Sequence, residues 1–304
     1  MVIRIVSMAS ERADRLASEP LRDMFPPHGV LSGSVGSVKD IWSRRGLLRL
    51  LVRREIRAKY KDSALGLIWS LVRPLIMLGI YYFVIGKVLG AARMVDNYAI
   101  FMYTGLAIWS LFQEAVSSGT GSILSNSGII KKTYLPREIF PLTSIGAALF
   151  NFAIQLVIVV VAALIFGGFR PSVNVVNFPL AVLVIVVWAT ALSFFLSAMN
   201  VYLRDVQYLV EVVLMIMFYA SPIIYPLTLA EPHFSNALLQ VYLLNPVTLS
   251  VMGMQGVLWR TTTVYPWPSY LDLRLLAVLI VGLIVMAIGQ RVFHRLQRNF
   301  AQEI

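Results

Sequence analysis

Apolar and polar residues divide the chain into a polar N-terminal part, one amphipathic segment and a series of long apolar segments. Residues 1–40 carry mixed charges and several Pro, Gly and Ser residues, which predicts a mobile tail. Six apolar segments follow, at about residues 64–87, 98–118, 140–167, 178–199, 207–227 and 273–291. A helix of about 20 residues crosses the hydrocarbon core of a bilayer. The pattern therefore predicts an all-α membrane protein with six transmembrane helices in residues 62–304.

The segment at residues 41–61 has the pattern of an amphipathic helix that lies in the headgroup plane. Its apolar face consists of Leu47, Leu48, Leu51, Val52 and Ile56. Its cations gather on the other side and are Arg49, Arg53, Arg54, Arg57 and Lys59. We therefore expect an N-terminal interface helix that runs directly into the first span.

Composition and charge support a membrane location. The chain is 58% hydrophobic and 13% charged, too apolar for an ordinary soluble domain. A net charge of +11 could indicate a nucleic-acid partner, but the basic residues flank the spans and do not gather on one solvated domain. Anionic lipid headgroups are therefore the expected partner, and nucleic acid is not. With both termini in the cytosol, 20 Lys and Arg lie in cytosolic segments and 5 in external ones, as the positive-inside rule requires.

The sequence offers no catalytic or metal-binding pattern. It has no Cys, and its three His (His28, His233 and His294) are widely separated. Its single Gly-Lys pair, Gly86-Lys87, ends a span and does not belong to a P-loop, so this chain is not expected to bind ATP or Mg²⁺. We therefore expect a protein that is not an enzyme and has no cofactor of its own.

Two charged residues within the spans require a partner, because an isolated charge at the bilayer centre costs at least a few kcal/mol. Arg73 in the first span and Glu114 in the second lie at about the same depth. We expect them to form an ion pair within one protomer. A role for them in a transport path is the other interpretation.

Aromatic and polar residues recur on single faces of three spans. Trp109 and Phe112 share a face of the second span, and Asn151 and Gln155 share one of the third. Tyr219 and Tyr225 lie near the end of the fifth span, which Pro222 and Pro226 interrupt. These residues can pack helices together, or they can line a path in which sugar rings stack on aromatic side chains.

The region between the fifth and sixth spans is predicted to be external. Residues 238–244 and 247–259 are apolar but too short to span, and Asn245-Pro246 between them has the pattern of a helix start. We expect two short helices that enter the outer leaflet or cap a cavity.

Five motifs in order resemble one family. They are the run of residues 54–70 followed by Pro74, the segment Tyr134-Leu135-Pro136-Arg137-Glu138 with Pro141, the run of residues 200–206, the break at residues 221–226, and Leu244-Asn245-Pro246. From about residue 40 to the C-terminus the chain resembles the ABC-2 type permeases that export lipid-linked polysaccharides such as O-antigen, teichoic acid, capsule or galactan.

The resemblance implies a homodimer of six-span subunits in a bacterial plasma membrane, paired with two copies of a separate nucleotide-binding subunit that binds ATP and Mg²⁺. It also implies external gate helices and cytosolic coupling segments in the second-to-third and fourth-to-fifth loops. The coupling candidates in this sequence are Lys131, Lys132, Tyr134, Arg137, Glu138, Arg204 and Asp205.

The expected function is export of a polyprenyl-diphosphate-linked glycan, with Arg49, Arg53, Arg54, Arg57 and Lys59 receiving the diphosphate headgroup or anchoring the helix to anionic lipid. Two other functions stay open. One is an ABC-2 exporter of a drug or simple lipid, and the other is an integral-membrane glycan polymerase or glycosyltransferase.

Overall fold

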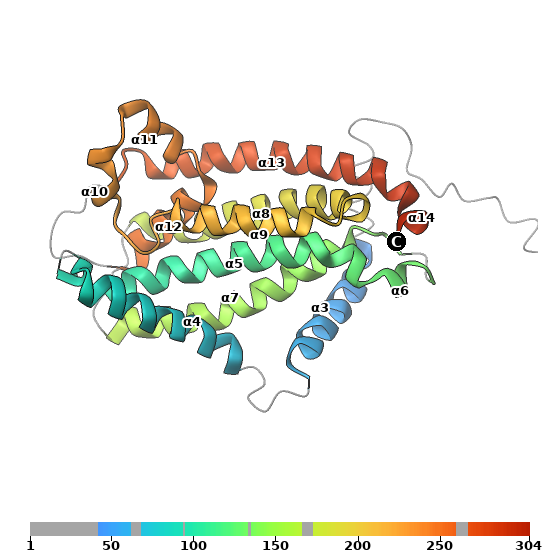
Figure 1. Ribbon diagram of the computed structural model, residues 1–304, viewed down its shortest axis with the longest axis horizontal. Coiled ribbons are helices and arrows are strands. Elements are labelled where there is room, and N and C mark those ends of the chain that lie inside the picture. The colour runs from blue at the N-terminus through green and yellow to red at the C-terminus, as the bar shows by residue number, and fades with distance from the viewer. Residues whose placement is uncertain (1–41, 62–67, 94, 133–134, 166–172, 260–266) are drawn as a thin grey trace, which may run out of the picture. The chain divides into compact units, whose positions relative to one another are not determined.

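The computed structural model describes residues 42–61, 68–93, 95–132, 135–165, 173–259 and 267–304. Every regular element within them is a helix, which confirms the all-α prediction (Figure 1). The elements are α3 (Arg45–Tyr60), α4 (Trp69–Tyr81), η2 (Tyr82–Val88), η3 (Ala91–Arg93), α5 (Tyr98–Ser125), α6 (Ser127–Ile130), α7 (Ile139–Ile165), η4 (Val173–Val176), α8 (Asn177–Tyr202), α9 (Val206–Tyr219), α10 (Leu227–Ala230), η5 (Glu231–His233), α11 (Asn236–Tyr242), α12 (Pro246–Leu258), α13 (Leu271–Leu296), η6 (Gln297–Asn299) and α14 (Phe300–Glu303). Arg44–Ile304 forms one compact unit. The predicted tail lies outside the described residues.

Five helical segments in the described part of the chain are long and apolar enough to cross a membrane: α4 with its π-helical continuation η2, α5, α7, α8 and α13. Helices α11 and α12 pass the same test as a pair bent by 79°. The fifth predicted span differs from the expectation, because α9 has only 14 residues and extends about 21 Å. It ends early because the chain turns at Ser221-Pro222, as the proline pattern indicated.

The core of the unit lies between α5, α8 and α12, with α13 packed on α8 and α7 packed on α5. Helices α5 and α8 approach closely where Gly119 faces Ser193. A Cβ at Gly119 would lie 2.2 Å from the Ser193 Oγ, and that hydroxyl donates to the Ala115 carbonyl at 3.1 Å. Small residues at this crossing therefore set the distance between the two helices.

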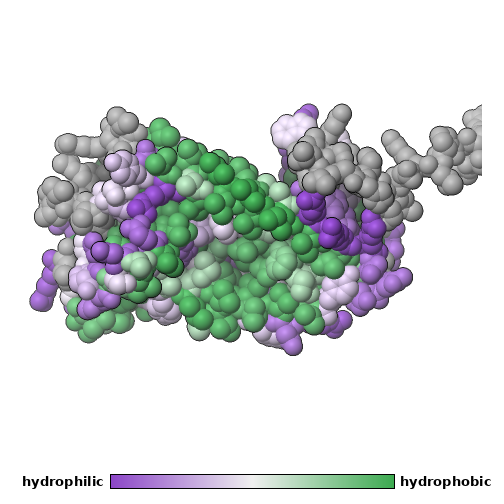
Figure 2. Space-filling view, turned by 90° about the horizontal axis from the view of Figure 1, so that it is seen from above, coloured by the Kyte–Doolittle hydropathy of each residue, from purple (hydrophilic) through white to green (hydrophobic). Residues whose placement is uncertain are grey.

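The outer surface of the spans is apolar. Figure 2 shows a hydrophobic band over the helices and hydrophilic residues toward their ends. The largest exposed apolar faces belong to α4, α9 and α13. Helix α4 has no buried residue and contacts mainly α5 and α7. Lipid or another apolar surface must cover these faces.

The two short helices before α13 form as predicted. The Asn245 side chain accepts a hydrogen bond from the Val247 N–H at 3.0 Å, and Pro246 occupies the first turn of α12. Ser235 caps α11 in the same way, through the Leu238 N–H at 3.3 Å. Helix α12 is buried along almost its whole length against α5, α8 and α13.

Candidate functional site

Helix α3 packs along α7, and the two helices leave a groove. Leu51 is buried on the inward face of α3, whereas Arg49, Arg53 and Arg57 are exposed. These three arginines lie one helical turn apart and line, with Phe150 of α7 and apolar side chains of α3, a groove of about 500 Å³. Guanidinium groups spaced in this way suit an elongated anion that offers several oxygen acceptors. We call this feature the arginine groove.

The other two predicted headgroup cations point elsewhere. The Arg54 guanidinium donates to the Asn126 Oδ1 at the end of α5, at 2.5 Å. Lys59 is bonded to Glu114 of α5, and neither cation lines the groove. The five cations therefore do not form one patch, because Arg54 and Lys59 lie one and two positions after groove arginines and consecutive residues of a helix point to different sides.

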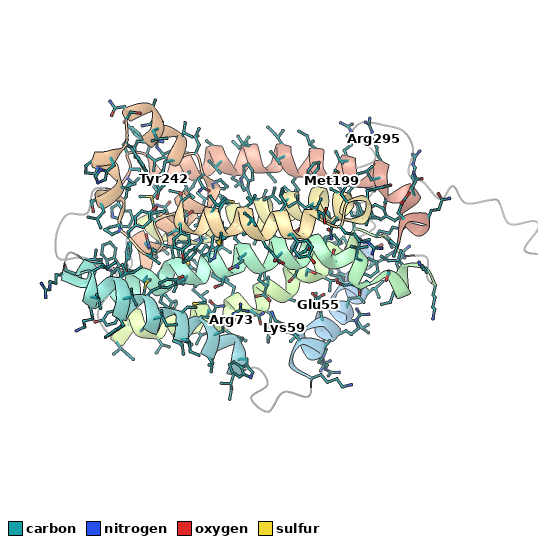
Figure 3. The ribbon with its side chains drawn as sticks, viewed as in Figure 1. Glu55, Lys59, Arg73, Met199, Tyr242 and Arg295 are labelled. Atoms are coloured by element: carbon teal, nitrogen blue, oxygen red, sulfur yellow. The ribbon has the colours of Figure 1, made fainter. Side chains whose placement is uncertain are left out.

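The predicted ion pair between Arg73 and Glu114 is not formed. Glu114 binds Lys59 instead, and its Oε1 also accepts a hydrogen bond from the Asn151 amide of α7 at 2.6 Å. Arg73 is exposed on α4 (Figure 3), with no hydrogen bond or ion pair to any residue that the structure describes. The sequence indicated that Glu114 needs a cation, but spacing along the chain could not reveal that the last turn of α3 reaches α5.

Glu55 lies on the same face of α3 as Lys59 and faces α7. Its Oε1 accepts a hydrogen bond from the Ser144 Oγ at 3.2 Å. Burial raises the pKa of the Glu55 carboxyl above its ordinary value of 4.5. The Ser144 hydroxyl and the cations Arg54 and Lys59 lower this pKa but do not offset the burial, and Glu114 raises it further.

The second half of α5 carries a line of small and polar residues that are exposed or half-buried, which we call the polar stripe. Its members are Ser110, Gln113, Glu114, Ser117, Ser118, Gly121 and Ser125. Gln207 of α9 borders it and donates to the Ser117 carbonyl at 3.4 Å and the Ser117 Oγ at 3.3 Å. Hydroxyl, amide and carboxylate groups of a spanning helix are costly against lipid. This face of α5 therefore requires polar surroundings.

The aromatic residues of α5 predicted to line a path are buried within this chain. Trp109 and Phe112 are buried beside the polar stripe, with 4% and 0% of their surfaces exposed. Trp109 packs on Phe218 of α9 with ring centroids 5.5 Å apart, and its indole N–H donates to the Gln113 Oε1 at 3.0 Å. Both aromatic residues thus hold helices together. The spacing of Ser and Gln residues in α5 was the signal that the sequence analysis missed.

The predicted path residues of α7 are also enclosed. Asn151 and Gln155 are 4% and 3% exposed, and the Asn151 amide is bonded to Glu114. Both therefore belong to helix packing within this chain.

The two tyrosines near the broken end of α9 remain accessible. Tyr219 is 55% exposed, and Tyr225 is half-buried. The Tyr225 hydroxyl donates to the Tyr219 carbonyl at 2.8 Å and lies 3.4 Å from the Tyr242 hydroxyl of α11. Both side chains are therefore accessible at this end of α9.

The irregular segment after α9 is held by polar side chains that sequence reasoning missed. The Gln255 amide of α12 donates to the carbonyls of Phe101 and Pro222, at 3.3 and 3.2 Å. The Tyr98 hydroxyl donates to the Ile224 carbonyl at 2.5 Å. Buried backbone outside a helix needs such partners. The signal was one Gln within the apolar run of α12.

The predicted coupling residues divide into exposed and buried groups. Lys131 and Lys132 after α6 are exposed, as are Arg204 and Asp205 in the turn before α9. Tyr134 lies outside the described residues. The exposed four remain free of the core and available to a partner surface.

Glu138 and Arg137 are used inside the chain. Glu138 is 2% exposed, and its Oε1 lies 2.8 Å from the His294 Nε2 and accepts from the Gln290 amide at 3.1 Å. The Arg137 guanidinium lies over the Phe300 ring, 5.6 Å from its centroid. The Glu138 side chain is thus bonded within the chain and not exposed on its surface. No local pattern indicates these contacts, because at least 152 positions of the sequence separate Glu138 from its partners.

No group of three or more potential metal ligands is present among the described residues. The described part of the chain thus offers apolar spans, the polar stripe on α5, an irregular segment that ends α9, and the arginine groove. These features define a multi-pass α-helical membrane protein with a polar face inside its membrane domain.

Comparison with known proteins identifies the family. Residues 46–259 match the ABC-2 type transporter family, and the chain belongs to it. It is 28% identical over 267 residues to the O-antigen export system permease protein RfbA of Myxococcus xanthus, covering 88% of this chain and 98% of that protein. It is 28% identical over 257 residues to a protein of the same name from Klebsiella pneumoniae, covering 84% and 94%. The polysialic acid transport protein KpsM of Escherichia coli is 24% identical over 243 residues, covering 77% and 89%.

Proposed function

We propose that this chain is the permease subunit of an ATP-driven exporter that moves a polyprenyl-diphosphate-linked polysaccharide across the bacterial plasma membrane. The family and the names of the similar permeases support a polysaccharide as the cargo. The observation that carries the proposal is the polar stripe. A hydroxyl-rich cargo needs hydrogen-bonding partners along its path, and few fixed charges let it slide.

The path requires a second surface. Ser118 and Gln113 are exposed on the stripe, and Arg73 is exposed on α4. An exposed cation and exposed hydroxyls in spanning helices are costly against lipid, so another protein surface must cover them. A second copy of the chain, facing its partner through α4 and α9, would close the stripe into a conduit. We therefore propose a homodimer.

The arginine groove is the proposed site where the diphosphate headgroup is received. Arg49, Arg53 and Arg57 can share its oxygens, and Phe150 with the apolar side chains of α3 provides contact for the first isoprene units. Plain anchoring to anionic lipid uses the same cations. The two roles are separated by measuring binding of a soluble polyprenyl-diphosphate analogue in competition with phosphatidylglycerol vesicles of equal charge. Preferred binding of the analogue supports headgroup reception, and equal competition by the vesicles supports plain anchoring.

ATP and Mg²⁺ are proposed to bind two copies of a separate nucleotide-binding subunit. That subunit would dock on the exposed cytosolic residues Lys131, Lys132, Arg204 and Asp205. Both termini would lie in the cytosol, and α10 to α12 would lie on the external side. ATP-driven closure of the nucleotide-binding subunits would push on these loops and reorient the spans.

The test is transport in vesicles that contain the chain, its nucleotide-binding subunit and the lipid-linked glycan of its own cell. Ser118→Trp should block ATP-dependent glycan movement, because the indole fills the path. Leu283→Trp, at an exposed apolar position of α13, is the matched control and should leave transport unchanged. Transport by Ser118→Trp at the wild-type rate would contradict the proposed path.

Two outcomes would support the competing functions. Movement of a drug or simple lipid, with no movement of the glycan, would assign the chain to a different kind of exporter. Glycan elongation without the nucleotide-binding subunit would assign it to the glycan polymerases.

A further inference from the structure

The C-terminal segment, residues 290–304, contacts both cytosolic loops of the membrane domain. One loop follows α6 and leads into α7, and the other joins α8 to α9. Figure 1 places the C-terminus and α14 at the end of the unit where α6 lies. These contacts lie outside the conduit, the arginine groove and the broken helix, and the proposed function does not use them.

The first loop is tied to the segment by charged and polar side chains. Glu138 is held by His294 at 2.8 Å and by Gln290 at 3.1 Å. The His294 Nδ1 lies 2.6 Å from the Gln297 amide nitrogen, which fixes the imidazole orientation. Because Glu138 is 2% exposed, losing these donors would leave a buried carboxylate without compensation.

The second loop is tied to the same segment by an aromatic contact and one hydrogen bond. Tyr202, the last residue of α8, donates its hydroxyl proton to the Leu296 carbonyl at 2.9 Å. Its ring also meets the Phe300 ring edge-on, with centroids 6.3 Å apart. The exposed pair Arg204 and Asp205 follows two and three residues later.

Phe300 joins the two sets of contacts. It is fully buried, and it touches the Arg137 guanidinium on one side and Tyr202 on the other. Phe293 of α13 packs on it as well, with centroids 5.5 Å apart. One side chain near the end of the chain therefore bridges two loops that lie more than 60 residues apart in the sequence.

We propose that the C-terminal segment is a strut that makes the two cytosolic loops move as one body, with His294 and Phe300 as positioning residues. This inference rests on the proposed function, in which a nucleotide-binding subunit pushes on these loops. A force on Lys131 or Lys132 would then reach Arg204 and Asp205 through Phe300, without passing through the spans. Neither positioning residue touches the cargo or the nucleotide.

The test uses the full-length chain with its nucleotide-binding subunit in lipid nanodiscs. His294→Ala removes the donor to Glu138, whereas His294→Gln keeps an N–H donor near the same place. Arg295→Ala is the matched control, because Arg295 is the exposed neighbour (Figure 3) and makes no hydrogen bond or ion pair within the described residues. Phe300→Ala breaks the bridge itself, and Phe152→Ala is its control, as a buried phenylalanine in a different part of the core.

Two quantities are measured: amide hydrogen exchange in both loops, and permease-stimulated ATP hydrolysis. His294→Ala and Phe300→Ala should speed exchange in both loops by about tenfold and lower the stimulated kcat without changing the KM for ATP. His294→Gln should restore both quantities, and Arg295→Ala should change neither. Phe152→Ala should lower thermal stability while leaving exchange in the two loops at the wild-type rate.

Faster exchange in only one loop, or wild-type stimulation by Phe300→Ala, would overturn the strut. Failure of the proposed function looks different. In that case the wild-type chain would not stimulate ATP hydrolysis at all, whereas exchange in the two loops would still report on the strut.

Discussion

Lys59 on α3 and Glu114 on α5 form an ion pair that ties α3 to a helix long and apolar enough to span a membrane. The Lys59 side chain is 49% exposed and that of Glu114 is 21% exposed, so water screens the pair only in part. Asn151 of α7 holds the same carboxylate at 2.6 Å. Three helices therefore meet at Glu114.

We expect Lys59→Ala and Glu114→Ala to be coupled. In a thermal-unfolding cycle in detergent, the double variant should be less destabilised than the sum of the single variants, by about 1 kcal/mol. Arg73→Ala serves as the control, because Arg73 does not contact Glu114 in this structure, and its effect should add to that of Glu114→Ala. Additive effects of Lys59 and Glu114 would show that their contact contributes nothing.

Glu55 should make stability depend on pH. Its pKa is raised above 4.5 in the folded protein by burial, so the folded state holds this proton more tightly than the unfolded state. Stability from this group is therefore highest at low pH and falls as the pH rises from 4.5 through the folded-state pKa. Glu55→Gln, which can keep a bond to Ser144, should remove this loss of stability. At pH values above the folded-state pKa of Glu55, it should therefore raise the melting temperature. An unchanged pH profile would mean that the carboxyl titrates normally.

The crossing of α5 and α8 should not tolerate a side chain at Gly119. Gly119→Ala places a methyl group against Ser193 and breaks its bond to the Ala115 carbonyl, at a cost of about 1–3 kcal/mol in unfolding free energy. Gly121→Ala is the matched control, because the nearest atom to a Cβ there is 3.5 Å away. It should be neutral or stabilise the helix by about 0.5–1 kcal/mol. Equal effects of the two substitutions would argue against the close approach.

Gln255→Leu should loosen the segment after α9. The substitution leaves the carbonyls of Phe101 and Pro222 without their donor in a buried site, which costs about 1–3 kcal/mol. Gln240→Leu, on the exposed face of α11, should have little effect on the melting temperature. Similar melting temperatures for wild type and Gln255→Leu would mean that the segment does not depend on this clamp.

The absence of native Cys allows a direct test of topology. Lys132→Cys should react with an impermeant maleimide only after the membrane is opened, whereas Ala237→Cys on α11 should react in intact spheroplasts. Both positions are exposed in the structure, so a difference in labelling reports the side of the membrane. The reverse pattern would invert the proposed orientation.

Features that depend on residues close together in the sequence could be predicted. The long apolar helices, the helix at Arg45–Tyr60, the cap at Asn245 and the break at Pro222 all follow from residue periodicity and from backbone preferences within a few residues. The partner of Glu114 and the contacts of Glu138 could not be predicted, because they depend on which helices are neighbours. The sequence interpretation placed the path on the aromatic residues of α5, because aromatic rings can stack on sugars. In the structure Trp109 is buried and Ser118 is exposed.

The burial of α12 determines when, during synthesis of the chain, the core of the membrane domain can be completed. This helix enters the core without crossing it, and it contacts α5 and α8, which are synthesised earlier, as well as α13, which is synthesised later. Gly253 of α12 faces Leu275 of α13, at 3.1 Å from a Cβ placed there. The centre of the membrane domain therefore stays incomplete until the last span has been inserted. A chain released before residue 271 would lack α13 and leave exposed the faces of α8 and α12 that α13 covers.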